Sequence, residues 1–309
     1  MDQVVARAAA QRAVAVADGG VKGDGGLVLV IGGSRAYTAP PFLAGMAARR
    51  TGVHGVRIAA PPGPAAGHVV LEAHLIEAPG PELDAAAVRT VAELSARIGE
   101  RLTMDGARGR LVWLVGPGLG GSPRASQVLD ALVEARWQDR SAALVVDGSL
   151  GRGPAARRRI RALGADLVLL NRHEARALLP AGSRPSGREA LLGAAELAAL
   201  ARQLEAVVVA KGDVDRITDG TRTWQVPAGH PGLARHGTGD VLAGVVAGLL
   251  AQTLPAPDAA GLACHLVGTA GARLTADTGP GWLSQDLLGA VATALRDLLT
   301  TPGAPHRPA

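Results

Sequence analysis

The stretch from residue 230 to 250 reads His-Pro-Gly-Leu-Ala-Arg-His-Gly-Thr-Gly-Asp-Val-Leu-Ala-Gly-Val-Val-Ala-Gly-Leu-Leu, a glycine-rich turn that runs into an apolar helix. The free N–H groups and the dipole of a helix start attract anions. Gly237 and Gly239 lack a Cβ, so the backbone can approach a phosphate closely. A carboxylate beside a phosphate is unfavourable unless it acts chemically, and Asp240 is placed to take a proton from an attacking hydroxyl. The stretch therefore predicts a phosphoryl-transfer centre.

Around this stretch, short β-branched runs alternate with amphipathic helical stretches. The alternation predicts an α/β fold in which helices flank a central, mainly parallel sheet. The dipeptide Asp219-Gly220 is a turn signal and predicts a hairpin between the last two expected strands. The expected strands are Leu27–Ile31, Gly55–Ala59, Val69–Leu71, Leu111–Val115, Ala143–Val146, Leu167–Leu170, Ala206–Val209, Arg216–Thr218 and Thr223–Val226. The expected helices are 3–17, 39–51, 84–101, 123–137, 154–163, 172–179, 186–203, 239–253, 257–276 and 283–299.

Length and composition narrow the class of protein. The 309 residues are 48% apolar, which predicts a single domain over 1–301, and the Pro- and Gly-rich end at 302–309 is expected to be a disordered tail. The net charge of +5 is nearly all arginine, but aromatics that would stack on single-stranded bases make up only 2%, so we expect no nucleic-acid partner. No signal peptide and no membrane span are recognisable, which predicts a cytoplasmic protein. The single cysteine, Cys264, is expected to be a buried filler.

Two further glycine loops each follow an apolar strand. Gly-Gly-Ser-Arg-Ala-Tyr-Thr-Ala-Pro occupies 32–40, at the carboxyl end of a strand where α/β proteins bind ligands, and it contains Tyr37, the only tyrosine. Gly-Pro-Gly-Leu-Gly-Gly at 116–121 fits the dinucleotide pattern G-x-G-x-x-G. Pro117 removes an N–H where a pyrophosphate needs a donor, which argues against a hydride-carrier site. A dinucleotide could still bind there as a substrate.

Two polar segments complete the predicted site. Lys211 stands at the end of a buried strand, where it can neutralise a nucleotide phosphate, and Asp213 and Asp215 could hold Mg²⁺ through water. Asn171 and Glu174 have the spacing of a capping box, which explains both residues without a ligand. Glu174 could also reach a metal shell through water. Both interpretations stay open.

These segments occur in one order, and the series resembles the NAD(P)H-hydrate dehydratases of the ribokinase-like superfamily. The resemblance covers about Gly23 to Leu298. Gly-Thr-Gly-Asp at 237–240 indicates the superfamily, and the opening block through Ala-Arg-Arg-Thr-Gly at 48–52 makes the match more specific. The resemblance implies a ribokinase-like three-layer fold. It also implies ADP-dependent dehydration of the S form of hydrated NADH or NADPH, through phosphorylation of the C6 hydroxyl and loss of phosphate, with ATP as the nucleotide in some members.

The resemblance also implies roles for single residues. Asp240 corresponds to the base, which also contacts substrate, and Mg²⁺ is the expected metal ion. The residues expected to bind the nucleotide are Lys211, Gly212, Asp213, Val214, Asp215, Gly237, Thr238 and Gly239, and those expected to contact the hydrated dinucleotide are Tyr37, Ala39, Pro40, Gly118 and Asn171. The chain departs from the usual family pattern at Ala39, Asn171, Ser149 and His236. These departures affect substrate contacts and leave the base and the phosphate loop intact.

The family often carries an epimerase domain before the dehydratase, and here we expect the epimerase to be a separate protein. Family members often assemble as dimers or tetramers, so the resemblance implies a homo-oligomer. Two other functions remain open. One is an ATP-dependent kinase of a vitamin-precursor alcohol, and the other is a nucleotide sensor without turnover, for which Asp240 would have no purpose.

Overall fold

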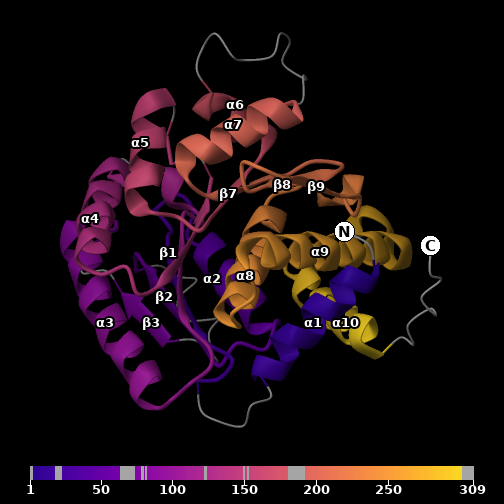
Figure 1. The fold of residues 1–309 in the computed structure, drawn as a ribbon, viewed down its shortest axis with the longest axis horizontal. Helices are drawn as coiled ribbons and strands as arrows, with labels where there is room; N and C mark the ends of the chain where they lie inside the picture. Colours follow the sequence, from indigo (N-terminus) through magenta and orange to yellow (C-terminus); the bar gives the residue numbers. More distant parts are fainter. Residues whose placement is uncertain are drawn as a thin grey trace.

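The computed structural model describes residues 3–17, 23–62, 74–77, 80, 82–121, 124–148, 150–151, 153–179 and 192–300. A nine-stranded sheet forms the centre of this described part, and helices cover both of its faces (Figure 1). The strand order is β3-β2-β1-β4-β5-β6-β7-β8-β9, parallel from β3 to β7 and antiparallel from β7 to β9. The strands are β1 Leu27–Ile31, β2 Gly55–Ala60, β3 His74–Glu77, β4 Leu111–Val115, β5 Ala143–Asp147, β6 Leu167–Leu170, β7 Val207–Ala210, β8 Asp215–Thr218 and β9 Thr223–Val226.

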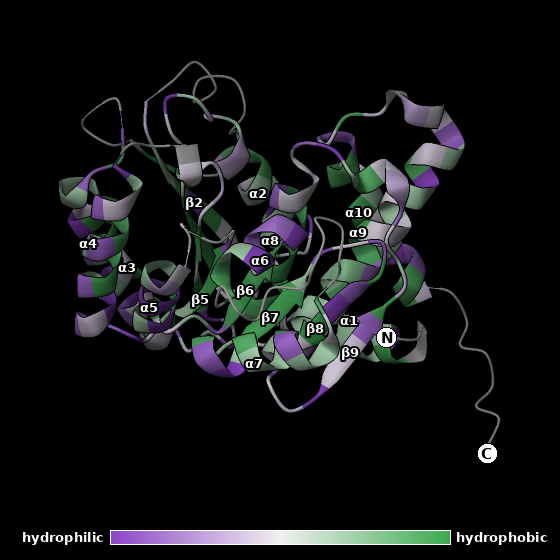
Figure 2. Ribbon diagram, turned by 90° about the horizontal axis from the view of Figure 1, so that it is seen from above, coloured by the Kyte–Doolittle hydropathy of each residue, from purple (hydrophilic) through white to green (hydrophobic). Residues whose placement is uncertain are grey.

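The central strands are apolar along their whole length because both faces are covered. Successive side chains of a strand point to opposite faces, so β4 sends Val112 and Leu114 into one core and Trp113 and Val115 into the other. Figure 2 shows these apolar strands enclosed between helices that carry their polar residues outward. The first core packs under α1 Gln3–Ala17, α2 Pro40–Arg49, α8 Thr238–Ala251, α9 Ala256–Thr278 and α10 Asp286–Thr300. The second packs under α3 Ala85–Met104, α4 Ala125–Gln138, α5 Gly153–Leu163, α6 Arg172–Leu178 and α7 Ala194–Leu204.

The predicted α/β fold with a mainly parallel sheet is confirmed, and so is the hairpin, since β8 and β9 pair antiparallel around residues 219–222. The predicted strand Val69–Leu71 lies outside the described residues. Strand β3, which is not among the strands expected from the sequence, pairs with β2. Of the helix predicted over 186–203, residues 186–191 lie outside the described part of the chain, and α7 begins at Ala194 because Gly193 is extended (ψ 163°) and serves as its N-cap. The last helix begins at Asp286 rather than 283, because the Asp286 carboxylate accepts a hydrogen bond from the Leu283 N–H.

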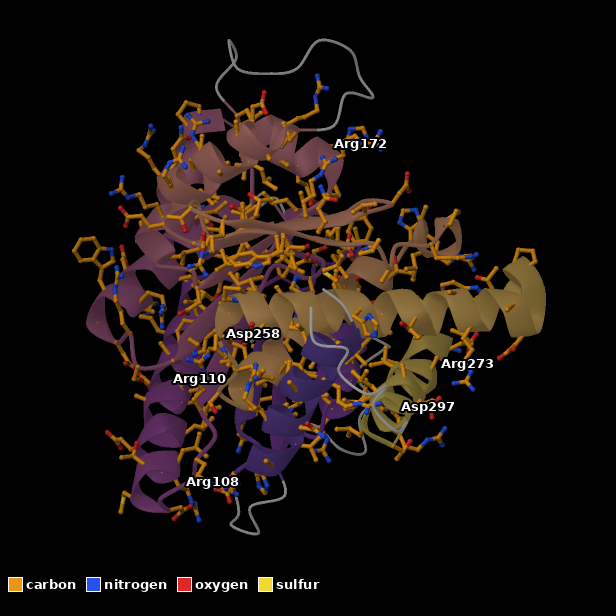
Figure 3. All side chains as sticks on the ribbon, turned by 45° about the vertical axis from the view of Figure 1, so that its right-hand side comes forward. Arg108, Arg110, Arg172, Asp258, Arg273 and Asp297 are labelled. Carbon is orange, nitrogen blue, oxygen red and sulfur yellow. The ribbon has the colours of Figure 1, made fainter. Side chains whose placement is uncertain are left out.

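The carboxyl ends of the parallel strands all meet at one edge of the sheet, where open α/β proteins bind ligands. Arg172, which begins α6, lies at this edge, whereas Arg108 and Arg110 lie at the opposite end of the molecule (Figure 3). Arg110 closes that opposite end by donating to the Leu250 carbonyl at the C-terminal end of α8 (2.8 Å). The N-terminus of α8 therefore points toward the ligand-binding edge. No helix in the described part of the chain is long and apolar enough to cross a membrane.

Candidate active site

A cavity of about 400 Å³ opens at the carboxyl end of β7, which is within the usual size range of small-molecule sites. Its walls come from the start of α6, the segment after β7, the turn before α8, the first turn of α8 and the middle of α9. The lining residues are Asn171, Arg172, His173, Lys211, Gly212, Asp213, Asp215, Gly229, His230, Leu233, Ala234, Arg235, Thr238, Gly239, Leu242, Cys264, Val267 and Gly268.

The N-terminus of α8 forms the inner wall of this cavity. Gly237 is the N-cap with φ +89°, and no side chain in the described structure caps this terminus. The Thr238 hydroxyl is directed backward, within hydrogen-bond distance of the Leu233 carbonyl (2.7 Å) and the Arg235 carbonyl (3.0 Å). Thr238 thus fixes the turn that precedes the helix, and the first-turn amides are left to bind an anion.

Lys211 provides a positive charge at the same place. Its ammonium donates to Asp147 Oδ1 at 3.0 Å, and a Cβ on Gly239 would lie only 3.2 Å from Lys211 Nζ. Burial lowers the pKa of Lys211, but the carboxylates of Asp147 and Glu174 outweigh it and raise the pKa above its usual value. Lys211 is therefore a permanent cation against the first turn of α8.

Asp240 is the third residue of α8 and is half-buried. Burial raises its pKa to about 7, with a further increase from the negative charge of Asp147, while Lys211 opposes the shift. A carboxylate with a pKa close to neutral pH can both accept and hold a proton, as a general base must. Asp240 is not on the cavity wall itself. It forms a charged group with Lys211, which does line the cavity, and with Asp147.

Asn171 and Glu174 form the expected capping box of α6. Asn171 Oδ1 accepts from the Glu174 N–H (2.9 Å), and the Asn171 N–H donates to Glu174 Oε2 (2.7 Å). Burial raises the pKa of Glu174, and Lys211 opposes this. Asn171, expected among the contacts to the dinucleotide, lies on the wall of the cavity beside Lys211.

Asp215 also lines the cavity, but its carboxylate is engaged by the protein. Its Oδ1 accepts from the Gly212 N–H (3.0 Å), and the buried Cys264 thiol bonds to it from α9. Burial and the Asp215 charge raise the pKa of Cys264 well above the ordinary thiol value, so the thiol stays protonated. Cys264 is buried, as the sequence predicts, and it also fixes the turn at 212–215.

A second group of predicted residues meets where the loops after β1 and β4 touch. The Gly33 N–H donates to the Pro117 carbonyl (2.7 Å), and a Cβ on Gly118 would lie 2.8 Å from the Tyr37 carbonyl and 3.2 Å from Pro40 Cγ. Tyr37 is 55% exposed at this surface. The loop after β4 also lies against the backbone of Asp147, since a Cβ on Gly116 would lie 2.1 Å from the Asp147 carbonyl oxygen.

The predicted residues thus gather in two neighbouring places. Lys211, Gly212, Asp213, Asp215, Thr238, Gly239 and Asn171 line the cavity, and Tyr37, Pro40 and Gly118 lie together at the glycine loops. Ala39 is the exposed N-cap of α2 and uses no side-chain bond there. Val214 is 38% exposed and lies outside the cavity lining, because the turn at 212–215 directs it to solvent. Ser149 lies outside the described residues.

Several cavity residues were not predicted, including Gly229, His230 and Arg235. They lie in the loop just before the Gly-Thr-Gly-Asp motif. Of the three, only Gly229 carries a signal that the sequence could have given, namely its being a glycine. A Cβ there would meet the Asp213 carbonyl at 2.2 Å, so this position requires glycine. Arg235 stacks on Trp282 (4.0 Å to the ring centre) and donates to its carbonyl, which fixes one side of the cavity.

A metal ion held by side chains alone needs several ligating groups close together. Within the described residues, no three His, Cys, Asp or Glu side chains are grouped closely enough to hold a metal ion. The Glu174 carboxylate lies beside the loop after β5, where a Cβ on Gly148 would be 3.5 Å from Glu174 Oε1.

The sheet order, the helix-terminal anion hole and the cavity define a ribokinase-like α/β protein. Solved structures agree on the fold. A ribokinase-like superfamily protein from Enterococcus faecalis is 21% identical, with a TM-score of 0.70 over 91% of this chain and 90% of that one. An ADP/ATP-dependent NAD(P)H-hydrate dehydratase from Bacillus subtilis, co-crystallised with ATP/Mg²⁺, is also 21% identical, with a TM-score of 0.63 over 91% of this chain and 92% of that one.

The chain belongs to the NAD(P)H-hydrate dehydratase family, whose sequence model matches residues 28–292. It is 33% identical over 277 residues to the bifunctional NAD(P)H-hydrate repair enzyme Nnr of Pyrobaculum aerophilum, covering 89% of this chain and 51% of that protein. It thus spans about half the length of the bifunctional relatives that it matches. The ADP-dependent (S)-NAD(P)H-hydrate dehydratase of Natrialba magadii is 30% identical over 276 residues, 88% of this chain and 93% of that protein.

Proposed function

We propose that this protein dehydrates the S form of hydrated NADH and NADPH back to NAD(P)H and consumes ADP in doing so. Family membership and the Natrialba magadii relative support the reaction. One observation carries its assignment to this site. The Asp240 carboxylate stands at the N-terminus of α8 with a pKa of about 7, in one charged group with Lys211 at the inner wall of the cavity.

The two ligands would bind in the two parts of the site, the cavity and the glycine loops after β1 and β4. The adenosine part of the nucleotide would occupy the cavity, with its terminal phosphate at the amides of Gly237–Gly239. The hydrated nicotinamide would lie at the glycine loops near Tyr37 and Gly118, on the other side of the charged group. In this arrangement the C6 hydroxyl would meet the terminal phosphate directly, beside Asp240 and Lys211.

The chemistry that these residues would perform has two steps. Asp240 takes the proton of the C6 hydroxyl while the hydroxyl oxygen attacks the terminal phosphorus, and AMP leaves. The C6–O bond then breaks with release of inorganic phosphate, a far better leaving group than hydroxide, and a proton is lost from C5 to form the ring double bond. Hydrate and ADP therefore yield NAD(P)H, AMP and phosphate. The amides of α8 and the Lys211 ammonium would stabilise the charge on the transferred group.

Mg²⁺ fits this site as a counter-ion for the phosphates. Asp147, Glu174 and Asp240 already outnumber the single ammonium of Lys211, so a nucleotide would add further negative charge to an acidic group. The metal would supply that missing positive charge, held by the phosphates and reached by Glu174 through water.

The test uses the purified full chain with the S form of hydrated NADH, ADP and Mg²⁺. We expect the NADH absorbance to return, with one AMP and one phosphate formed for each NADH. The R form should not react, which makes it the matched substrate control. Absence of recovery with both ADP and ATP would overturn the proposal. A stable phosphorylated alcohol formed from ATP would favour the kinase instead, and nucleotide binding without turnover would favour a sensor.

The proposal has consequences for partners. Because only the S form is consumed, an epimerase that interconverts the two forms would have to act alongside this protein. We also propose that the protein works as a homo-oligomer, a dimer or tetramer, in the cytoplasm.

A further inference from the structure

The ion pair of Asp147 and Lys211 is buried inside the proposed site. The two side chains are 12% and 19% exposed, and Lys211 Nζ lies 3.0 Å from Asp147 Oδ1. Removing two charges from water is unfavourable, and the attraction between them offsets the loss only when their geometry is good. A pair of this kind within a site therefore calls for an explanation beyond stability.

The pair bridges the end of one strand. Asp147 is the last residue of β5, and Lys211 directly follows β7, with β6 between them. The Lys211 N–H donates to the Leu170 carbonyl at the end of β6 (2.8 Å). Backbones two strands apart are separated by about 10 Å, a distance that an extended lysine and an aspartate cover together. The pairing therefore draws the ammonium sideways, over the end of β6 and toward β5.

The ammonium comes to lie against the first turn of α8. Gly239 makes this possible, because a Cβ there would be only 3.2 Å from Lys211 Nζ. The backbone carbonyl of Asp147 in turn lies against Gly116, in the loop after β4. The ammonium thus lies at the N-terminus of α8, where the terminal phosphate of a nucleotide would bind.

We propose that Asp147 is a positioning residue, which holds the Lys211 ammonium over the end of β6 so that it contacts the terminal phosphate of a nucleoside diphosphate rather than the AMP portion. Lysine is a flexible point charge on four carbons, and without a partner its ammonium would move toward water. Asp147 itself touches neither ligand. The inference rests on the proposed function only in taking a nucleoside diphosphate as the ligand.

The test measures binding of ADP and AMP to the full chain by calorimetry, with no hydrate present. We expect Lys211→Met to weaken ADP binding by about 10- to 100-fold, the range for a hydrogen bond to a charged group, and AMP binding by less than about 2-fold. Asp147→Asn should also weaken ADP binding more than AMP binding, as Lys211→Met does. The double variant should match Lys211→Met alone, because Asp147 acts only through the lysine.

Two further variants keep the test decisive. Asp130→Asn breaks the surface pair with Arg159, away from the site, and should leave both affinities unchanged. If Asp147→Asn does not fold, Asp147→Glu keeps the charge but displaces the ammonium by one methylene, so it too should lower the ADP preference. Equal losses of ADP and AMP affinity in Lys211→Met, or an unchanged preference in both Asp147 variants, would overturn the proposal. A failure to regenerate NADH would count against the dehydratase reaction and leave this result untouched.

Discussion

Replacing Asp240 by Asn should make the protein more stable at neutral pH and nearly inactive. A carboxyl whose pKa rises from 3.8 to about 7 on folding is held in a place that disfavours its ionised form. The shift corresponds to an upper limit of about 4 kcal/mol at pH 8. Because Asp240 is half-buried and retains some solvation, we expect a gain of about 1–3 kcal/mol from an amide of the same shape.

The sign of the effect can be checked with pH. Between pH 4 and 7 the folded protein binds the Asp240 proton more tightly than the unfolded chain, so this group lowers the free energy of unfolding as pH rises. The advantage of Asp240→Asn should therefore be full at pH 8, less than half as large at pH 5 and small near pH 4. Urea unfolding of both proteins at these pH values measures it.

The same variant is assayed for turnover and for ADP binding. Loss of a general base should lower kcat by at least about 100-fold, with ADP affinity largely kept. Asp84 provides the control, since it is an ordinary N-cap whose carboxylate accepts from the Ala87 N–H at 2.9 Å. Asp84→Ala should lose about 1 kcal/mol at pH 5 and pH 8 alike. If Asp240→Asn loses stability at both pH values as Asp84→Ala does, and kcat and ADP affinity fall together, Asp240 is a helix cap and its assignment as the base is refuted.

Three further results are expected. The value of kcat/KM should rise with pH up to about 7 and then level off, as Asp240 ionises; a flat profile from pH 5 to 8 would argue against this base. Gly237→Ala should lose about 1–3 kcal/mol of stability and most activity, because its φ is +89° and the new Cβ would lie 2.5 Å from Ser284 Oγ; unfolding and turnover assays measure both. In Gly118→Ala the residue has φ +71° and the new Cβ would lie 2.8 Å from the Tyr37 carbonyl oxygen. This variant should raise KM for the hydrate more than 10-fold while KM for ADP changes little. Equal changes in the two constants would contradict the division of the site.

The sequence predicts the fold well because its signals are local. Strands such as β4 are apolar at every position, as a sheet covered on both faces requires. The edge strand β3 is different, since its polar residues His74 and Glu77 give no buried pattern. The start of α7 at Ala194 cannot be predicted from helix propensity, which does not reveal that Gly193 takes an extended conformation.

The same contrast holds for the site. The anion hole at 237–240 can be read from consecutive residues, whereas the pairing of Asp147 with Lys211 joins residues 64 positions apart across an intervening strand. The sequence places Asp147 at a strand end but cannot say which cation turns toward it. Asn171 shows a related limit, because its capping role follows from spacing, whereas its place on the cavity wall depends on how α6 packs beside β7.

A crystal structure of the full chain with a non-hydrolysable ADP analogue and Mg²⁺ tests the central claim most directly. We predict adenosine in the cavity between Lys211 and Val267, the terminal phosphate on the amides of Gly237–Gly239, and the Asp240 carboxylate facing the phosphorus from the side of the glycine loops. A terminal phosphate bound elsewhere, or an Asp240 carboxylate turned away from it, would contradict the assignment of Asp240 as the base.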